Sequence, residues 1–293
     1  MSNIVCFGEV LWDVFPSYKK IGGAPLNVAL RLNSFNNNVT IISSIGNDTN
    51  GIELLNYIKK EGLNSSYIQV NKTIKTSAVI VSLDASGSAS YSIEFPCAWD
   101  YVATNESNRR VVKNSKAFVF GSLIARNEKS YMTLLKLLNV APFKVFDVNL
   151  RPPHYQLSVL EELMQIADFI KFNDDELFEI CKAIGFNSND LTKNIEFISD
   201  YTKTDLICVT LGAKGAVFYL NNLFYFNNGY KVKVVDTVGA GDSFLAGLID
   251  KFLRNEHPQK AIDFACAVGA LVASNVGANP EITNKLEKFI NGL

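Results

Sequence analysis

Residues 236–247 read DTVGAGDSFLAG, and the fold that we expect for this chain follows from them. The preceding KVKVVD (231–236) alternates like a strand, and apolar residues at helical spacing follow the stretch. Gly239 and Gly241 therefore lie at a turn from a strand into a helix, with Asp242 in or just before the first helical turn. The first N–H groups of a helix have no partner within it, and its dipole is positive there, so this layout predicts an anion site.

An aspartate is an unusual residue for an anion site, because its carboxylate repels phosphate. Asp242 is well suited to another task there, which is to accept the proton of a hydroxyl group that attacks the phosphate. The alternative is that Asp242 only caps a helix and that the glycines only form the turn. The stretch by itself supports both interpretations equally.

Composition and charge exclude several classes of protein. The chain has 293 residues, of which 48% are hydrophobic, and a formal net charge of −1. We expect a single domain over residues 1–293, with no nucleic-acid or membrane partner. The start, MSNIVCFGEVLWD, lacks the basic region of a signal peptide. The 5 cysteines are dispersed without a CxxC pair, which favours reduced thiols and a cytoplasmic location.

Strand and helix patterns alternate along most of the chain, which predicts an α/β fold around a mostly parallel sheet. The alternation breaks at 77–95, where two β-type runs flank a turn at 84–87 and indicate a hairpin. Residues 12–16 can join it, so we predict a small β lid formed by 12–16 and 77–101. An extension at the edge of the main sheet would give the same pattern. The aromatic residues that would cover a site in the lid are Phe15, Phe95 and Trp99.

Polar residues gather where the predicted strands end, and in doubly wound sheets ligands bind outside the carboxyl ends of the strands. Alternate residues of a strand share a face, so several of these side chains can point into one crevice. The residues at these ends are Asp13, Gly22, Gly23 and Asn27 after the first strand, then Asp147, Asn149 and Arg151, then Asn173, then Thr210 and Gly212, and finally Asp236 and Thr237.

The tetrapeptide NDDE (173–176) has two explanations. Asn173 as N-cap with Glu176 three residues later forms a capping box, which is the more frequent meaning of this pattern. In the functional interpretation Glu176 lies near a hydrated magnesium ion, which takes few protein ligands and keeps its waters. Arg151 is either a surface residue or a clamp on a phosphate.

DTVGAGD (236–242) and GGAPLNVA (22–29) resemble the two signature motifs of the ribokinase-like, or pfkB-type, carbohydrate kinases. The resemblance covers essentially the whole chain. CAWDY (97–101), GSLIAR (121–126) and DVNLRPP (147–153) are similar to bacterial fructokinases within that family. The family resemblance implies a ribokinase-like three-layer αβα sandwich with a β-sheet lid. It also implies an ATP-dependent sugar kinase that converts D-fructose to fructose 6-phosphate. The alternatives are a kinase for 2-keto-3-deoxygluconate or ribose, and a non-catalytic sugar-binding protein.

The resemblance also implies a role for each matching residue. Asp242 would be the base, and the N–H groups of Gly239, Ala240 and Gly241 would form the anion hole. Arg151 would contact sugar or γ-phosphate, and Asp13, Gly23 and Asn27 would hold the sugar. Asn173, Thr210, Gly212, Gly241 and Asn275 would line the ATP site. Glu176 would order Mg²⁺ through water, and Asp236 would hold a monovalent cation such as K⁺, although Glu281 replaces the small residue usual beside that site. The lid would also suit a homodimer contact.

Overall fold

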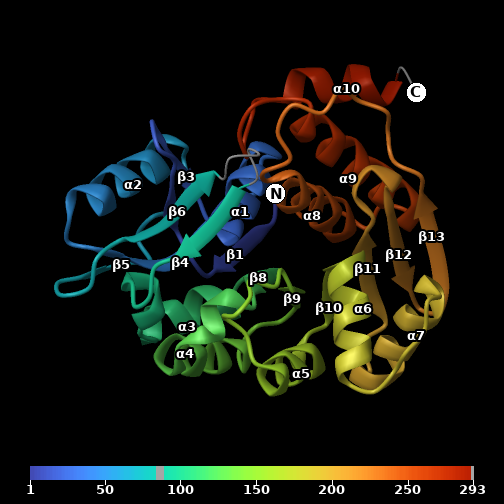
Figure 1. Ribbon diagram of the computed structural model, residues 1–293, viewed down its shortest axis with the longest axis horizontal. Helices are drawn as coiled ribbons and strands as arrows, with labels where there is room; N and C mark the ends of the chain where they lie inside the picture. The colour runs from blue at the N-terminus through green and yellow to red at the C-terminus, as the bar shows by residue number, and fades with distance from the viewer. Residues whose placement is uncertain (84–88, 292–293) are drawn as a thin grey trace.

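The computed structural model describes residues 1–83 and 89–291, which form a layered α/β body with a smaller sheet at one side (Figure 1). The main sheet has nine strands in the order β13-β12-β11-β10-β9-β8-β1-β4-β5. All neighbours pair in parallel except β11 with β12 and β12 with β13. The strands are β1 (Asn3–Phe7), β4 (Asn38–Gly46), β5 (Ile68–Asn71), β8 (Ala117–Gly121), β9 (Lys144–Asp147), β10 (Phe169–Asn173), β11 (Leu206–Thr210), β12 (Ala216–Leu220) and β13 (Leu223–Asn227).

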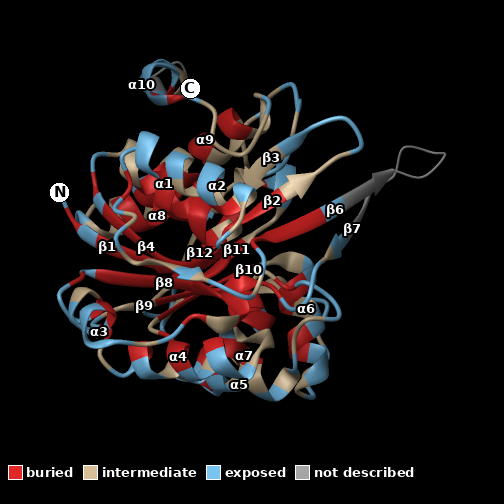
Figure 2. Ribbon diagram, turned by 90° about the vertical axis from the view of Figure 1, so that its left-hand side faces the viewer, coloured by how far each residue is buried: buried red, intermediate tan, exposed pale blue. Residues whose placement is uncertain are grey.

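Helices cover both faces of this sheet, as expected for parallel strands that are buried on both sides (Figure 2). One face carries α1 (Ala24–Ser34), α2 (Thr49–Lys60), α8 (Ala240–Leu253) and α9 (Pro258–Ala273), with α10 (Thr283–Asn291) packed on α9. The other face carries α3 (Glu106–Lys113), α4 (Glu128–Leu138), α5 (Leu157–Ile166), α6 (Asp174–Ala183) and α7 (Leu191–Thr202). The expected three-layer αβα sandwich with a mostly parallel sheet is therefore confirmed.

The lid is a separate four-stranded sheet in the order β3-β2-β6-β7. It contains β2 (Leu11–Val14), β3 (Lys19–Gly22), β6 (Ser77–Leu83) and β7 (Ala89–Ile93), and Figure 2 shows β6 and β7 extending away from the body. Because β2 pairs in parallel with β6, the segment after β1 does join the predicted hairpin, and the lid is not an edge of the main sheet. The hairpin turn expected at 84–87 lies outside the described residues.

The prediction that the lid extends to residue 101 is wrong. Residues Ala98–Tyr101 form a 3-10 turn, η1, whose Trp99 side chain is fully buried in the body. The guanidinium of Arg126 stacks on the Trp99 ring at 4.0 Å and pairs with Asp100 at 2.7 Å. This buried pair and the stacking hold η1 to the body, so Trp99 cannot act as a cover over a site.

The strand expected at 231–236 is also not observed. The segment crosses the end of α9, where the N–H groups of Val235 and Asp236 donate to the carbonyl of Ala273 at 2.8 and 3.3 Å. Val234 is 57% exposed. Val235 is 52% exposed as well, so the alternation in sequence does not correspond to one buried and one exposed face. Among the described residues no strand pairs with this segment, which is a loop.

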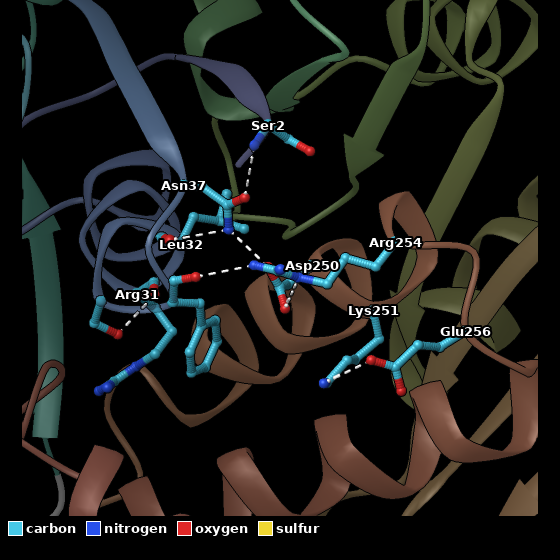
Figure 3. Close-up of polar contacts among 10 residues, drawn as sticks. Ser2, Arg31, Leu32, Asn37, Asp250, Lys251, Arg254 and Glu256 are labelled. Atoms are coloured by element: carbon cyan, nitrogen blue, oxygen red, sulfur yellow. Dashed lines mark hydrogen bonds and ion pairs between the residues drawn. The ribbon is translucent and has the colours of Figure 1, made fainter.

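Buried polar contacts fix the position of α8 against α1 (Figure 3). The amide of Asn37, which follows α1, donates to Asp250 of α8 at 2.7 Å and accepts from the N–H of Ser2 at 3.3 Å. Nη2 of Arg254 donates to the same Oδ1 of Asp250 at 2.9 Å, and its Nε donates to Oδ2 at 3.0 Å. Since charged hydrogen-bonded groups have narrow geometric preferences, these contacts set the register in which the two helices meet at the candidate site.

Within the two described stretches of the chain, no helix combines the length and the apolar character that crossing a membrane requires.

Candidate active site

The start of α8 is built as the glycine pattern predicts. Gly239 is the residue before the helix and has φ 76°, a left-handed conformation that glycine adopts without strain. A Cβ at Gly239 would lie 2.6 Å from the Cα of Ala278, so the segment after α9 packs directly on this turn. The N–H of Ala240 donates to the carbonyl of Thr237 at 3.2 Å and closes the turn.

Asp242 lies in the first turn of α8 and remains partly accessible to solvent. Burial raises its pKa to about 6, and the charge of Asp147 adds to this effect. A hydrogen bond from Asn27 and the cations Lys171 and Arg151 act in the opposite direction. Nδ2 of Asn27, on α1, donates to Oδ2 of Asp242 at 2.8 Å. The structure thus joins the two sequence motifs through one hydrogen bond, and it gives Asp242 a pKa that suits proton transfer near neutral pH.

The two glycines before α1 make room for the Asp13 carboxylate and for the backbone of Glu9. A Cβ at Gly22 would lie 2.4 Å from Oδ2 of Asp13, and a Cβ at Gly23, which has φ 111°, would lie 2.5 Å from the carbonyl oxygen of Glu9. Burial raises the pKa of Asp13, while Arg151 and Lys20 oppose the shift. Any larger residue at Gly22 would therefore displace the Asp13 carboxylate.

Two charged residues of the site, Glu9 and Lys171, were not predicted from the sequence. The Lys171 side chain on β10 is 7% exposed, and its Nζ lies 3.0 Å from Oδ1 of Asp147 at the end of β9. A Cβ at Gly241 would lie 3.9 Å from the same Nζ, so this ammonium group is close to the start of α8. Glu9 is 3% exposed, and burial raises its pKa to about 7 although Arg151 opposes the shift.

Arg151 lies on the loop after β9 and is exposed. Its Nη1 donates to the carbonyl of Leu150 at 2.8 Å. Its guanidinium charge opposes the increase that burial causes in the pKa of Asp13, Glu9 and Asp242. An exposed arginine in this position can reach an anionic ligand without losing a structural contact in the core.

The capping box at 173–176 is confirmed. The N–H of Glu176 donates to Oδ1 of Asn173 at 2.8 Å, and the N–H of Asn173 donates back to Oε2 of Glu176 at 2.8 Å. The other carboxylate oxygen, Oε1, accepts from the N–H of Leu150 at 2.9 Å. Burial raises the pKa of Glu176, while Lys171 opposes the shift. Glu176 therefore holds the loop after β9 against α6.

The remaining expected ligands of ATP lie along one edge of the sheet and at the end of α9. Asn173 and Thr210 end the neighbouring strands β10 and β11 in register. Gly212 has φ 57° and open space around its Cβ position. The Asn275 amide donates to the carbonyl of Leu271 at 2.7 Å, which satisfies the end of α9. The structure thus brings Asn173, Thr210 and Gly212 together at one edge.

Asp236 connects the turn before α8 to the segment after α9. Its Oδ1 accepts from the N–H of Val238 at 3.0 Å and its Oδ2 from the N–H of Gly277 at 3.0 Å. Nζ of Lys20, from lid strand β3, lies 3.6 Å from the same Oδ2. The carboxylate is therefore surrounded by donors, and one of them is a cation.

We expect activity to fall on the acid side of about pH 6. A base must be unprotonated to accept a proton, and the pKa of Asp242 is raised to about 6. The logarithm of kcat/KM should fall with a slope of about one per pH unit below that value, as for loss of a single base. Initial rates between pH 4.5 and 8.5 measure the profile. A profile that stays flat down to pH 4.5 would contradict the assignment.

Comparisons with known proteins show what the sequence of this chain is similar to. The sequence profile of the pfkB family carbohydrate kinases matches residues 1–285. Fructokinase-2 of Solanum lycopersicum is 27% identical over 313 residues, which cover 97% of this chain and 94% of that protein. Probable fructokinase-5 of Arabidopsis thaliana is 29% identical over 309 residues, which cover 95% of this chain and 94% of that protein.

Solved structures agree with the fold over its whole length. An uncharacterized sugar kinase from Pyrococcus horikoshii superposes with a TM-score of 0.86 at 28% identity and covers 99% of both chains. A Vibrio cholerae fructokinase crystallised with fructose, ADP and calcium superposes with a TM-score of 0.85 at 23% identity, again over 99% of both chains.

Proposed function

The chain belongs to the pfkB family of carbohydrate kinases, and from this premise we propose that it transfers the γ-phosphoryl group of ATP to D-fructose to give fructose 6-phosphate. The observation that best supports this proposal is the 2.8 Å hydrogen bond between Asn27 and Asp242, because it joins the candidate base to the GGAPLN motif. The matching plant proteins are named fructokinases, and a second structure of the Pyrococcus horikoshii sugar kinase contains ATP.

In the proposed reaction Asp13, Gly23 and Asn27 hold the sugar and present its hydroxyl group to Asp242. The carboxylate takes the hydroxyl proton while the oxygen attacks the γ-phosphorus, and the bond to the leaving ADP oxygen breaks. Negative charge on the transferring group is stabilised by the start of α8 and by Arg151. Because the N–H of Ala240 already donates to Thr237, we assign the anion hole mainly to the N–H groups of Gly239 and Gly241.

We propose that the rest of the triphosphate and the base of ATP lie along the edge formed by Asn173, Thr210 and Gly212, with Asn275 at its far end. Backbone groups and short polar side chains at the carboxyl ends of parallel strands are suited to this. The open space around Gly212 supports a close approach of the nucleotide to the backbone.

The donor set fits a hydrated magnesium ion with the triphosphate. Oδ2 of Asp147 is buried and accepts no hydrogen bond in the described part of the chain, so it is available to a metal-bound water. Each oxygen of Glu176 accepts one N–H group and keeps a second lone pair. When bound, magnesium would neutralise charge on the phosphates.

The fit to a monovalent cation beside Asp236 is poor. The Lys20 ammonium lies 3.6 Å from Oδ2 of Asp236 and already supplies a positive charge there, so a bound cation would be repelled. Glu281, the residue that departs from the family pattern, accepts from the N–H of Thr283 at 2.8 Å. We therefore derive no step from K⁺.

Asp13→Ala should raise the KM for the sugar and leave the KM for ATP nearly unchanged. The change removes a hydrogen bond between a charged group and a sugar hydroxyl, worth roughly 1.5–3 kcal/mol. Asn27→Ala should lower sugar affinity as well, but it should also lower kcat, because Asn27 donates to Asp242. Calorimetric titration with each ligand and steady-state kinetics measure the two effects. An equal loss of sugar and ATP affinity in Asp13→Ala would contradict the assignment.

We propose that the β sheet formed by β2, β3, β6 and β7 is a lid that closes on the sugar. Closure would exclude water that could attack the γ-phosphate. Amide exchange in residues 77–83 and 89–95 should slow by several-fold at saturating fructose, because closure would bury these strands. Exchange on α5 is the internal control. Unchanged exchange in both lid segments at saturating sugar would contradict closure.

The same sheet supports a homodimer, because β3 and β7 are its outer strands and can pair with another copy. Light scattering at micromolar concentration distinguishes the dimer from a monomer. We also place the protein in the cytoplasm, a proposal supported by its five free, buried cysteines.

A kinase assay across fructose, ribose, 2-keto-3-deoxygluconate and nucleosides tests the proposed function. We expect fructose-dependent release of ADP, with kcat/KM at least tenfold higher for fructose than for the other acceptors. Turnover with another sugar alone would correct the substrate. Sugar binding without ADP release from any acceptor would identify a non-catalytic binding protein.

A further inference from the structure

The side chains of Asn279, Asn27 and Asp242 form one chain of hydrogen bonds. Nδ2 of Asn279 donates to Oδ1 of Asn27 at 2.8 Å, and Nδ2 of Asn27 donates to Oδ2 of Asp242 at 2.8 Å. Asn27 is 5% exposed, so water has little access to its amide. The segment after α9 is therefore connected, through Asn27 on α1, to the carboxylate that we assign as the base.

The direction of this chain follows from Asp242. An ionised carboxylate only accepts hydrogen bonds, so Asn27 must turn its amide nitrogen toward Asp242 and its oxygen toward Asn279. Asn279 must then present its own nitrogen. Its Oδ1 is left buried and, within residues 1–83 and 89–291, without a hydrogen-bond partner. A buried oxygen without a hydrogen bond is unfavourable. That this orientation of Asn279 is nevertheless adopted indicates that its amide nitrogen is needed to donate to Asn27.

The backbone on both sides of Asn279 is fixed in place. The N–H of Gly277 donates to Asp236 at 3.0 Å, and Nη2 of Arg31 donates to the carbonyl of Pro280 at 2.9 Å. Between them, Ala278 packs against the turn at Gly239. Nε of Arg31 also donates to Oγ of Ser243, the residue after the candidate base, at 3.2 Å. Asn279 thus extends from an anchored segment, and its amide can hold a neighbouring side chain in one orientation.

We propose that Asn279 is a positioning residue that keeps the amide of Asn27 turned so that it donates to Asp242. It acts on Asp242 through Asn27. The inference rests on the proposed function, because it takes Asp242 as the base. It implies that a displacement of the segment 277–280 would also change the orientation of the Asn27 amide.

Three substitutions at Asn279 separate positioning from packing. Asn279→Ala and Asn279→Leu remove the donor, so Asn27 can turn. Asn279→Asp keeps the shape, but its carboxylate can only accept, so it competes with Asp242 for the amide nitrogen of Asn27. We expect kcat/KM for the sugar to fall about tenfold in the Ala and Leu variants and further in the Asp variant, since a hydrogen bond to a charged group is worth about one to two factors of ten.

A change in packing alone would not shift the pH profile of kcat/KM. The bond from Asn27 lowers the pKa of Asp242. Loss of this bond should therefore move the acid limb of kcat/KM to higher pH. We expect the limb at the highest pH in Asn279→Asp, at intermediate pH in the Leu and Ala variants, and at the lowest pH in the wild type. Val276→Asp is the matched control for added charge, because Val276 lies on the same segment and is 69% exposed. It should leave the acid limb in place.

A measurement without turnover keeps this inference separate from the proposed function. In protein labelled with ¹³C at aspartate carboxyl groups, the Asp242 signal is identified as the one missing from Asp242→Asn, and its titration midpoint should rise in the three Asn279 variants. A wild type that phosphorylates no sugar would refute the proposed function. The titration would still show whether Asn279 affects the pKa of Asp242 through Asn27. An active wild type whose variants keep both the acid limb and the Asp242 midpoint would overturn the inference, as would an Asp variant that is more active than the Ala variant.

Discussion

Asp242→Asn is expected to reduce kcat by about 10²–10⁴-fold, the usual contribution of a general base, while sugar and ATP still bind. The amide keeps the size of the side chain and can still accept from Asn27, which donates at 2.8 Å in the wild type. It cannot take a proton from the sugar hydroxyl. Single-turnover rates and calorimetric titration with each ligand measure the two properties. A variant that kept more than about a tenth of the wild-type kcat would refute the assignment of Asp242 as the base.

The same substitution should stabilise the protein near neutral pH. The pKa of Asp242 is raised from 3.8 to about 6, so between these values the folded state binds more protons than the unfolded state. The contribution of Asp242 to stability is therefore largest below pH 3.8 and is lost as pH rises through about 6. Relative to wild type, Asp242→Asn should gain up to about 3 kcal/mol in free energy of unfolding at pH 7.5, and less where solvent screens the group.

Urea unfolding of both proteins at pH 4 and pH 7.5 measures this gain, and it separates the two interpretations that the sequence left open. A carboxylate that served only to stabilise the start of a helix would have a lowered pKa, since the helix dipole favours its charge. The variant would then be less stable than wild type at pH 7.5. A gain in stability with a loss of turnover is expected only where the fold tolerates an unfavourable charge for its chemistry.

Local signals in the sequence predicted the parts of the site that lie on helix starts. Gly239 and Asp242 stand at the beginning of a helical apolar pattern, and Asn173 with Glu176 forms a capping box that needs no tertiary information. These features are determined within a few residues, so their positions could be read directly. The lid followed from a break in alternation, although KKIG (19–22) is too short and polar to be recognised as strand β3.

The errors arose where a distant partner decides the structure. The segment 231–236 alternates like a strand, but strand pairing is non-local and no neighbouring strand is present in the described chain. Glu9 and Lys171 lie inside or next to apolar strand runs and have no characteristic spacing. The partner of Lys171 is Asp147, which lies beside it only because β9 and β10 pair in parallel in that register. Such pairs can be recognised in a structure and not from one sequence.

The buried ion pair between Lys171 and Asp147 stabilises the structure around the candidate site. Both side chains are nearly inaccessible, at 7% and 6% exposed, and their charged atoms lie 3.0 Å apart. Burial alone would lower the pKa of Lys171, but the carboxylates of Asp147 and Glu176 outweigh it, and the pKa lies above its ordinary value. The ammonium group therefore stays charged at neutral pH.

Lys171→Met is expected to destabilise the protein by about 3–5 kcal/mol, because it leaves the Asp147 carboxylate buried without its cation. Urea unfolding at pH 7.5 measures the loss. The matched control is Lys171→Met combined with Asp147→Leu, which removes both charges and should recover most of the stability, since replacing a buried ion pair by apolar side chains is often neutral or favourable. A double variant no more stable than Lys171→Met would show that packing, and not charge, determines the loss. The positive charge of Lys171 also lowers the pKa of Asp242. In Lys171→Met the acid limb of kcat/KM should therefore move to higher pH. An acid limb that did not move would show that this charge has no effect on the pKa of the base.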